Sequence, residues 1–274
     1  MSDKLPTTID RRWLFAAFTS IAFANGAYEV VSRSLANGGL QQAILNGFEI
    51  SVIVWAALVC VLLLLARSRS QLTNTDIVVA LIASIGLLVP LPAASWVALS
   101  GFGFYLWFKA GRDDALKGAG IIMMSMSVPM FWSRLLFASF SDTILRLDAV
   151  LVGGIVGTGS VGNAVPFANG QGFLFLAPAC SSIANLSLAI LCGILFVVMQ
   201  GLPWSRRVLA TIALAGASTI IINVARIAAI GLFPDHYDSI HGPLGANIAQ
   251  WLSMAAMLII YVERLKPFRQ RAFR

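Results

Sequence analysis

The chain has 274 residues, of which 58% are hydrophobic and only 11% are charged, and its net charge is +7. Its mean hydropathy is +0.84, whereas about a quarter of the residues of a soluble domain are charged. A water-soluble globular fold is excluded, because no soluble core could bury so large an excess of apolar side chains. The composition predicts that a lipid bilayer surrounds most of the chain.

The first residues, MSDKLPTTIDRRW, are polar and contain two acidic side chains. They lack the short apolar stretch and the small-residue cleavage site of a removable signal peptide. We therefore expect the first membrane segment to be retained.

Apolar runs long enough to cross or nearly cross a bilayer lie at about 13–32, 43–65, 77–91, 93–109, 119–140, 181–200, 206–232 and 245–264. A spanning helix needs about 20 residues. The third and fourth runs, which meet at Pro90 and Pro92, are short and form either two spans joined by a tight turn or a re-entrant pair; the charges favour two spans. The sequence predicts an all-α polytopic membrane protein with about eight transmembrane helices, organised as a single integral-membrane domain over residues 1–274.

The positive charges predict the orientation of these spans, because Lys and Arg accumulate in cytoplasmic loops. If both termini are cytoplasmic, fifteen of the 19 cationic residues lie on the cytoplasmic side. They are Lys4, Arg11, Arg12, Arg67, Arg69, Lys109, Arg112, Lys117, Arg206, Arg207, Arg264, Lys266, Arg269, Arg271 and Arg274. This distribution predicts a multi-pass protein of the cell inner membrane with both termini inside. It also argues against a nucleic-acid partner, since the charges are spread over every cytoplasmic turn instead of forming one patch.

The segment 141–179 is more polar than its surroundings. Its first part, SDTILRLDAVLVGGIVG, predicts an amphipathic or interfacial helix. The run GTGSVG at 157–162 matches the dinucleotide pattern G-x-G-x-x-G, which has meaning only between a strand and a helix, so a flexible loop is the better interpretation. The pieces NAVPF and FLFLA flank Asn169-Gly170-Gln171-Gly172 and predict a hairpin turn at the outer face, before the sixth span.

Three cysteines, Cys60, Cys180 and Cys192, show no CxxC spacing. A disulfide framework and a structural zinc site are therefore not expected, and no metal or organic cofactor is predicted. Cys60 and Cys192 lie inside apolar runs, where cysteine acts as a small hydrophobe.

Cys180 stands in Ala-Pro-Ala-Cys-Ser-Ser, where the polar outer segment enters the sixth span. Ser181 and Ser182 suit the capping positions of that helix. A cysteine at a helix start lies at the positive end of the helix dipole, which favours the thiolate. The free amides of the first turn could also stabilise an oxyanion. The alternative is a small interfacial residue without a chemical role.

Arg226 lies in STIIINVARIAAIGLF, in the outer half of the seventh span, with Asn223 on the same helix face. Burying an arginine at the membrane centre costs about 2.5–3.5 kcal/mol on insertion scales, so such residues face a polar cavity or a partner. The alternative is an arginine that extends to the interface. His241 lies in the outer turn after this helix, and an imidazole there suits a general base, although surface histidines are usually only solvated.

Cys180, Arg226 and His241 together provide a nucleophile, a cation and a base at one membrane face. Ala-Cys-Ser at the start of a span, then Asn223-x-x-Arg226-Ile227, then His241 with Gly245 four residues later, resembles the exosortase/archaeosortase family over about 125–255. One departure is Ser182, where the family usually has glycine.

The resemblance implies a bacterial, exosortase-like cysteine protease or transpeptidase with Cys180 as nucleophile, assisted by Arg226 and His241, with Asn223 and Ser181 in supporting roles. Its partners would be secreted proteins with a C-terminal sorting signal of the PEP-CTERM kind, processed on the periplasmic side. The substrate helix would dock within the lipid bilayer, with Gly118-Ala119-Gly120 as candidate contact points. Two alternatives stay open: a membrane transporter, and a non-catalytic component of an exopolysaccharide export or assembly system.

Overall fold

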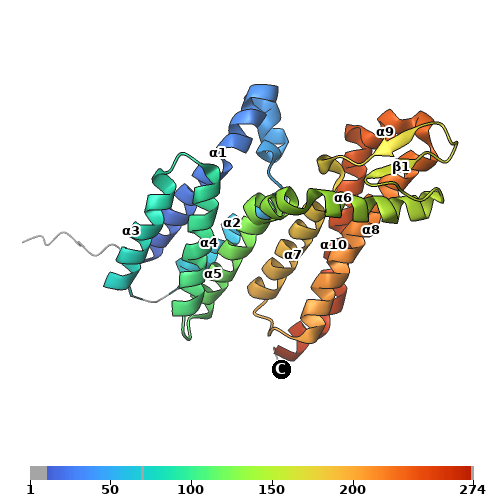
Figure 1. The fold of residues 1–274 in the computed structure, drawn as a ribbon. Coiled ribbons are helices and arrows are strands. Elements are labelled where there is room, and N and C mark those ends of the chain that lie inside the picture. Colours follow the sequence, from blue (N-terminus) through green and yellow to red (C-terminus); the bar gives the residue numbers. More distant parts are fainter. Residues whose placement is uncertain (1–10, 69–70, 273–274) are drawn as a thin grey trace, which may run out of the picture. The chain divides into compact units, whose positions relative to one another are not determined.

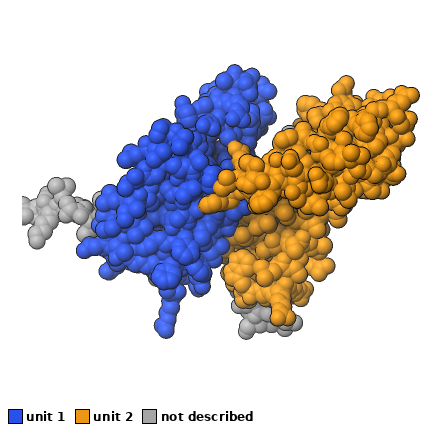
Figure 2. All heavy atoms as spheres, viewed as in Figure 1, with its two compact units in different colours: residues 1–131 blue, residues 132–274 orange. Residues whose placement is uncertain are grey.

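The computed structural model describes residues 11–68 and 71–272, and nearly all of this part of the chain is helical. Lys4, Arg69 and Arg274, which enter the charge argument, lie outside the described residues, as does the polar start at 1–10. The chain divides into two compact units, 1–131 and 132–274 (Figure 2). The single integral-membrane domain stays a prediction.

The first unit holds five helices and one short 3-10 turn. They are α1 Arg11–Leu45, η1 Gly47–Glu49, α2 Val52–Arg67, α3 Asn74–Leu88, α4 Pro92–Lys109 and α5 Asp114–Ser127. Helix α2 begins at Val52, and not near residue 43, because Phe48 and Glu49 adopt positive φ and Ser51 caps the helix. Helices α3 and α4 are separate and joined through Pro90, as both two spans and a re-entrant pair require, so two spans here stay a prediction.

Glycines bring α4 and α5 into close contact. A Cβ atom on Gly120 would lie 2.7 Å from the Trp107 amide nitrogen and would also strike the Gly103 carbonyl oxygen. Gly118 and Ala119 are buried on the same helix. The prediction that Gly118-Ala119-Gly120 offers a docking surface is therefore wrong: these small residues are used in packing α5 against α4.

A buried carboxylate joins three helices of the first unit. Asp76, which is fully buried, completes a capping box at the start of α3 with Thr73. It also accepts hydrogen bonds from Arg11 (3.0 Å), Tyr105 (2.6 Å) and Lys109 (3.2 Å). These hydrogen bonds hold the ends of α1, α3 and α4 together.

The second unit contains the predicted functional residues. Its elements are α6 Ser133–Val156, β1 Ala164–Pro166, β2 Phe173–Phe175, η3 Pro178–Cys180, α7 Ser182–Met199, α8 Arg206–Leu232, η4 Pro234–His236, α9 Tyr237–His241 and α10 Pro243–Ala272. Helices α7, α8 and α10 run side by side, whereas α6 crosses them at a steep angle (Figure 1).

The apolar run 119–140 is not one helix. It is divided between α5 and α6 by η2 Val128–Trp132, a π-helical turn. Pro129 lies in this turn, and a proline cannot donate the regular i to i−4 hydrogen bond. A second irregularity follows at Phe140, where φ is −130°. The predicted amphipathic segment after residue 140 forms the rest of α6, with its charged Asp142 and Arg146 exposed.

The structure supports a membrane environment. In the described part of the chain, α1, α7, α8 and Pro243–Lys266 of α10 are long and apolar enough to cross a membrane. Large apolar side chains such as Trp13, Phe108 and Trp251 are exposed, which a soluble surface would rarely carry in such number. The protein is therefore an all-α membrane protein in which at least these four helices fit a bilayer.

Candidate functional site

The hairpin that leads to Cys180 forms as predicted. Strands β1 and β2 are antiparallel, with Ala164 opposite Phe175. The turn holds Gly170 at φ 72°, and the Asn169 side chain accepts a hydrogen bond from the Gln171 amide (2.9 Å). The Ala168 amide donates to the Gly231 carbonyl (3.0 Å), so the hairpin is tied to α8.

The G-x-G-x-x-G run is a loop between α6 and β1, so it lacks the strand-to-helix setting of a dinucleotide site. Gly157 ends α6 with φ 82°, a left-handed conformation that suits glycine. The loop then returns over α6, where a Cβ atom on Gly153 would strike the Gly159 carbonyl. These glycines serve the turn that carries the chain from α6 into the hairpin.

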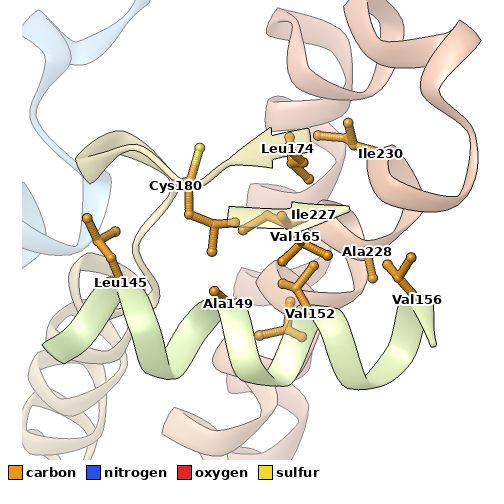
Figure 3. Close-up of a cluster of buried hydrophobic side chains, with 12 residues drawn as sticks. Leu145, Ala149, Val152, Val156, Val165, Leu174, Cys180, Ile227, Ala228 and Ile230 are labelled. Carbon is orange, nitrogen blue, oxygen red and sulfur yellow. The ribbon is translucent and has the colours of Figure 1, made fainter. Parts of the chain in front are cut away.

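Cys180 closes the short 3-10 turn that joins the hairpin to α7. Its residue surface is 9% exposed, and it borders a buried apolar cluster (Figure 3). The cluster comprises Leu145, Ala149, Val152, Val156, Val165, Leu174, Leu176, Val224, Ile227, Ala228 and Ile230. Figure 3 shows the sulfur atom pointing away from α6. The thiol thus lies at a helix start and in apolar surroundings, and is held there by packing from α6, α8 and the hairpin.

Ser181 is the N-cap of α7, as predicted. Its Oγ accepts a hydrogen bond from the Ile183 amide at 3.3 Å. Ser182 is not a second cap but the first helical residue, and it is buried.

The amides around Cys180 are already in use. Those of Cys180 and Ser181 donate to the carbonyls of Ala177 (2.9 Å) and Pro178 (3.2 Å). The Ser182 amide donates to Oδ2 of Asp148 at 3.1 Å, and the Ile183 amide is used by the cap. In this conformation the Ser182 and Ile183 amides of the first turn are therefore not free to hold an oxyanion, contrary to the prediction for these two groups. Capping side chains and the preceding turn satisfy them first.

Asn223 of α8 holds the other side of this turn. Its Nδ2 donates to the Cys180 carbonyl oxygen at 2.7 Å and to the Ser182 Oγ at 3.1 Å. Asn223 was predicted to support Arg226, but the structure instead joins it directly to the cysteine segment. Ser182 stands at the position where a glycine was expected. Its hydroxyl has a partner in this structure, because it accepts the second hydrogen bond from Asn223.

Arg226 lies one turn after Asn223 on α8. Its Nε is buried and has no hydrogen-bond partner among the described residues. The side chain lines a pocket of about 410 Å³ formed by α8, the α9 segment and α10, together with residues such as Ala225, Ile240 and Gly245. The prediction was a polar cavity or a partner, whereas most residues that line this pocket are apolar; a role for Arg226 stays a prediction. Cys180 and His241 are not among the residues that line this pocket.

His241 ends α9 and is exposed. Its ring stacks on that of Tyr237, with ring centroids 4.9 Å apart and an interplanar angle of 12°. Its neighbour Ile240 packs against the cluster around Cys180. No hydrogen bond joins His241 to Cys180 in the part of the chain that the structure describes. The structure thus brings together Cys180, Ser181, Ser182 and Asn223, and leaves the imidazole outside this group.

Asp148 is a functional candidate that the residue pattern did not single out. It lies within the segment SDTILRLDAVLVGGIVG, is 5% exposed and accepts a hydrogen bond from the start of α7. Its signal was the spacing of α6, where Leu145, Asp148, Ala149 and Val152 recur at helical intervals on the buried face. A carboxylate in such a stripe needs a partner.

Comparisons with protein-family models, with curated proteins and with solved structures give no match for this chain. Among the described residues, no group of His, Cys, Asp and Glu is placed to hold a metal ion. The fold and the site together define an all-α membrane protein in which a buried cysteine is held at the start of a helix.

Proposed function

We propose that this protein is a membrane-embedded cysteine protease or transpeptidase that cleaves secreted proteins bearing a C-terminal sorting signal, and transfers them to an acceptor. The observation that carries the proposal is the pair of hydrogen bonds from Asn223 to the Cys180–Ser182 turn. They couple the thiol segment to α8, which also carries the buried Arg226 Nε, a nitrogen without a hydrogen-bond partner among the described residues.

In the proposed reaction the Cys180 thiolate attacks the carbonyl carbon of the scissile peptide bond. Oxyanion stabilisation falls to Arg226, because the neighbouring backbone amides are occupied. The thiol proton passes to His241 and then to the leaving amine, which departs as the thioester forms. An amine acceptor or water then attacks the thioester and releases the thiol. Proton transfer requires α9 to bring the imidazole closer when substrate binds, as catalytic hydrogen bonds often tighten only in that complex.

The proposed topology has eight spans, with both termini cytoplasmic and the hairpin on the periplasmic side of the inner membrane. The eight apolar runs fall in order on α1, α2, α3, α4, α5 with the η2 turn and the start of α6, α7, α8 and α10. The rest of α6, after residue 140, would lie along the interface. Helices α2 and α3 have 16 and 15 residues, which is about 22–24 Å. They are shorter than the hydrocarbon core of about 30 Å, so local thinning of the bilayer would accommodate them.

The test is to co-express the chain with a secreted protein that ends in a short motif, an apolar helix and an Arg cluster. Cys180→Ala should abolish processing, and His241→Ala and Arg226→Ala should each slow it by about 10²–10³-fold. Cys192→Ala is the matched control, since Cys192 is a buried cysteine of α7, the helix that follows Cys180, and it should process normally. Processing that persists in Cys180→Ala would sink the thiol mechanism and favour a non-catalytic role.

A further inference from the structure

Asp148 is a buried acid at the centre of the second unit that the proposed reaction does not use. It lies on α6, is 5% exposed, and is flanked along its helix by members of the apolar cluster that borders Cys180. Its Oδ2 accepts a hydrogen bond from the Ser182 amide, 34 residues later in the chain. A carboxylate of α6 therefore reaches the first turn of α7, two residues after the thiol.

The burial of Asp148 is unfavourable unless its charge is compensated. In the described residues it forms no ion pair with a Lys or Arg side chain. The group that compensates the Asp148 charge is therefore the start of α7, because the amide N–H groups and the helix dipole there favour an anion. Asp148 thus occupies the positive end of the α7 helix dipole, two residues after Cys180.

We propose that Asp148 is a positioning residue for Cys180: its carboxylate fixes the first turn of α7 and thereby holds the thiol segment in a closed arrangement. This inference rests on the proposed function for the role of Cys180 as nucleophile. Asp148 from α6 and Asn223 from α8 both bind Ser182 in this turn. Asp148 accepts a hydrogen bond from the Ser182 amide, and Asn223 donates one to the Ser182 hydroxyl. The resting site is then a closed one, in which the turn is held and its amides are unavailable.

Few other charges act on this turn. The first turn of α7 holds no acidic residue, and the hairpin residues 164–176 hold no charged residue. Asp142 and Arg146 are exposed on α6. Helix α6 also carries Arg134 near its start. On α8, Arg226 lies in the half that holds Asn223, and Arg206 and Arg207 lie at the opposite end of the helix. The segment after α8 holds Asp235, His236, Tyr237, Asp238 and His241, and the charged residues of α10 begin at Glu263. Removing the charge at 148 should therefore have a visible effect on the thiol.

The test measures iodoacetamide alkylation of Cys180 across a range of pH, in a protein whose Cys60 and Cys192 are alanine. Asp148→Asn keeps a hydrogen-bond acceptor but removes the charge, which weakens the bond from the Ser182 amide and loosens the turn, so Cys180 should be alkylated about three- to tenfold faster. Asp142→Asn is the matched control, because it removes an exposed acid from the same helix. It should stay within about twofold of the parent protein.

A second pair of variants isolates the hydrogen bond from the charge. Proline is tolerated at the first helical position but has no N–H, and the Ser181 backbone at φ −65° and ψ 138° is compatible with a following proline. Ser182→Pro should therefore leave α7 intact and release Asp148, and it should expose Cys180 to alkylation several-fold more than Ser182→Ala, which loses only the hydroxyl.

Superimposable alkylation profiles for Asp148→Asn and Asp142→Asn, or equal rates for Ser182→Pro and Ser182→Ala, would overturn the inference. These measurements need no substrate. Processing that persists in Cys180→Ala would therefore refute the proposed function while the alkylation comparison still stands. Processing that depends on Cys180 but is indifferent to Asp148 variants at every pH would refute the role of Asp148 alone.

Discussion

Replacing Asn223 with alanine should loosen the turn that carries Cys180. Asn223 is buried on α8 and donates two hydrogen bonds to the start of α7, at 2.7 Å and 3.1 Å. Alanine removes both donors and leaves the helix otherwise unchanged. The start of α7 then keeps only its own cap and the contact with Asp148.

The expected loss follows from two hydrogen bonds. Hydrogen bonds between membrane helices contribute about 0.6 kcal/mol on average, and those in soluble proteins about 0.5–1.5 kcal/mol. Asn223→Ala should therefore lower the free energy of unfolding by about 1–3 kcal/mol. Asn223→Asp should be at least as damaging, because an ionised carboxylate cannot donate to the Cys180 carbonyl.

The assay is unfolding of the detergent-solubilised protein in a denaturing detergent, combined with the rate of Cys180 alkylation under native conditions. Thr219→Val is the matched control. Thr219 is fully buried one turn earlier on α8, and its hydroxyl bonds only within the helix, to the Gly216 carbonyl (2.8 Å). Equal stability and equal alkylation rates for Asn223→Ala and Thr219→Val would show that the turn does not depend on Asn223.

Two further predictions concern the first unit and the orientation. Asp76→Asn should destabilise the protein by about 3–5 kcal/mol in the same unfolding assay, because it leaves the buried Arg11 without its carboxylate; Glu263→Gln, at an exposed ion pair, should change stability by less than about 1 kcal/mol. Cysteine placed at Gln171 in the hairpin turn should react with an impermeant maleimide on spheroplasts, and cysteine at Arg112 only after permeabilisation. The reverse pattern would refute the proposed orientation.

The candidate site shows which structural features can be predicted from residue patterns and which cannot. The hairpin followed from its turn residues and alternating strands, and Ser181 as a cap followed from its place before an apolar run. Both depend on interactions within a few residues of one another. The partners of those elements did not follow, because the bond from Asn223 to Cys180 joins residues 43 positions apart. Nothing local to either residue specifies that contact.

Chemical expectations drawn from one helix were the least secure. A free helix start favours a thiolate and offers amides to an oxyanion, but that holds only if nothing else approaches. Asp148 approaches from α6 and takes one of those amides. The same limit applies to Gly118-Ala119-Gly120, where the small residues were recognised but their neighbour, α4, was not.

The sequence by itself indicated that the protein lies in a membrane and located most of its helices. It could do so because hydropathy and helix capping depend on composition and on short spacings along the chain. It also marked Cys180 and Arg226, since a thiol at a helix start and a charge in an apolar run are unusual where they stand. Tertiary structure alone decided that α6 crosses the other helices of its unit and that Asp148 and Asn223 enclose the cysteine turn. It also left His241 exposed on Tyr237. Those outcomes depend on which distant side chains the packing brings within hydrogen-bond distance, and no local pattern encodes that choice.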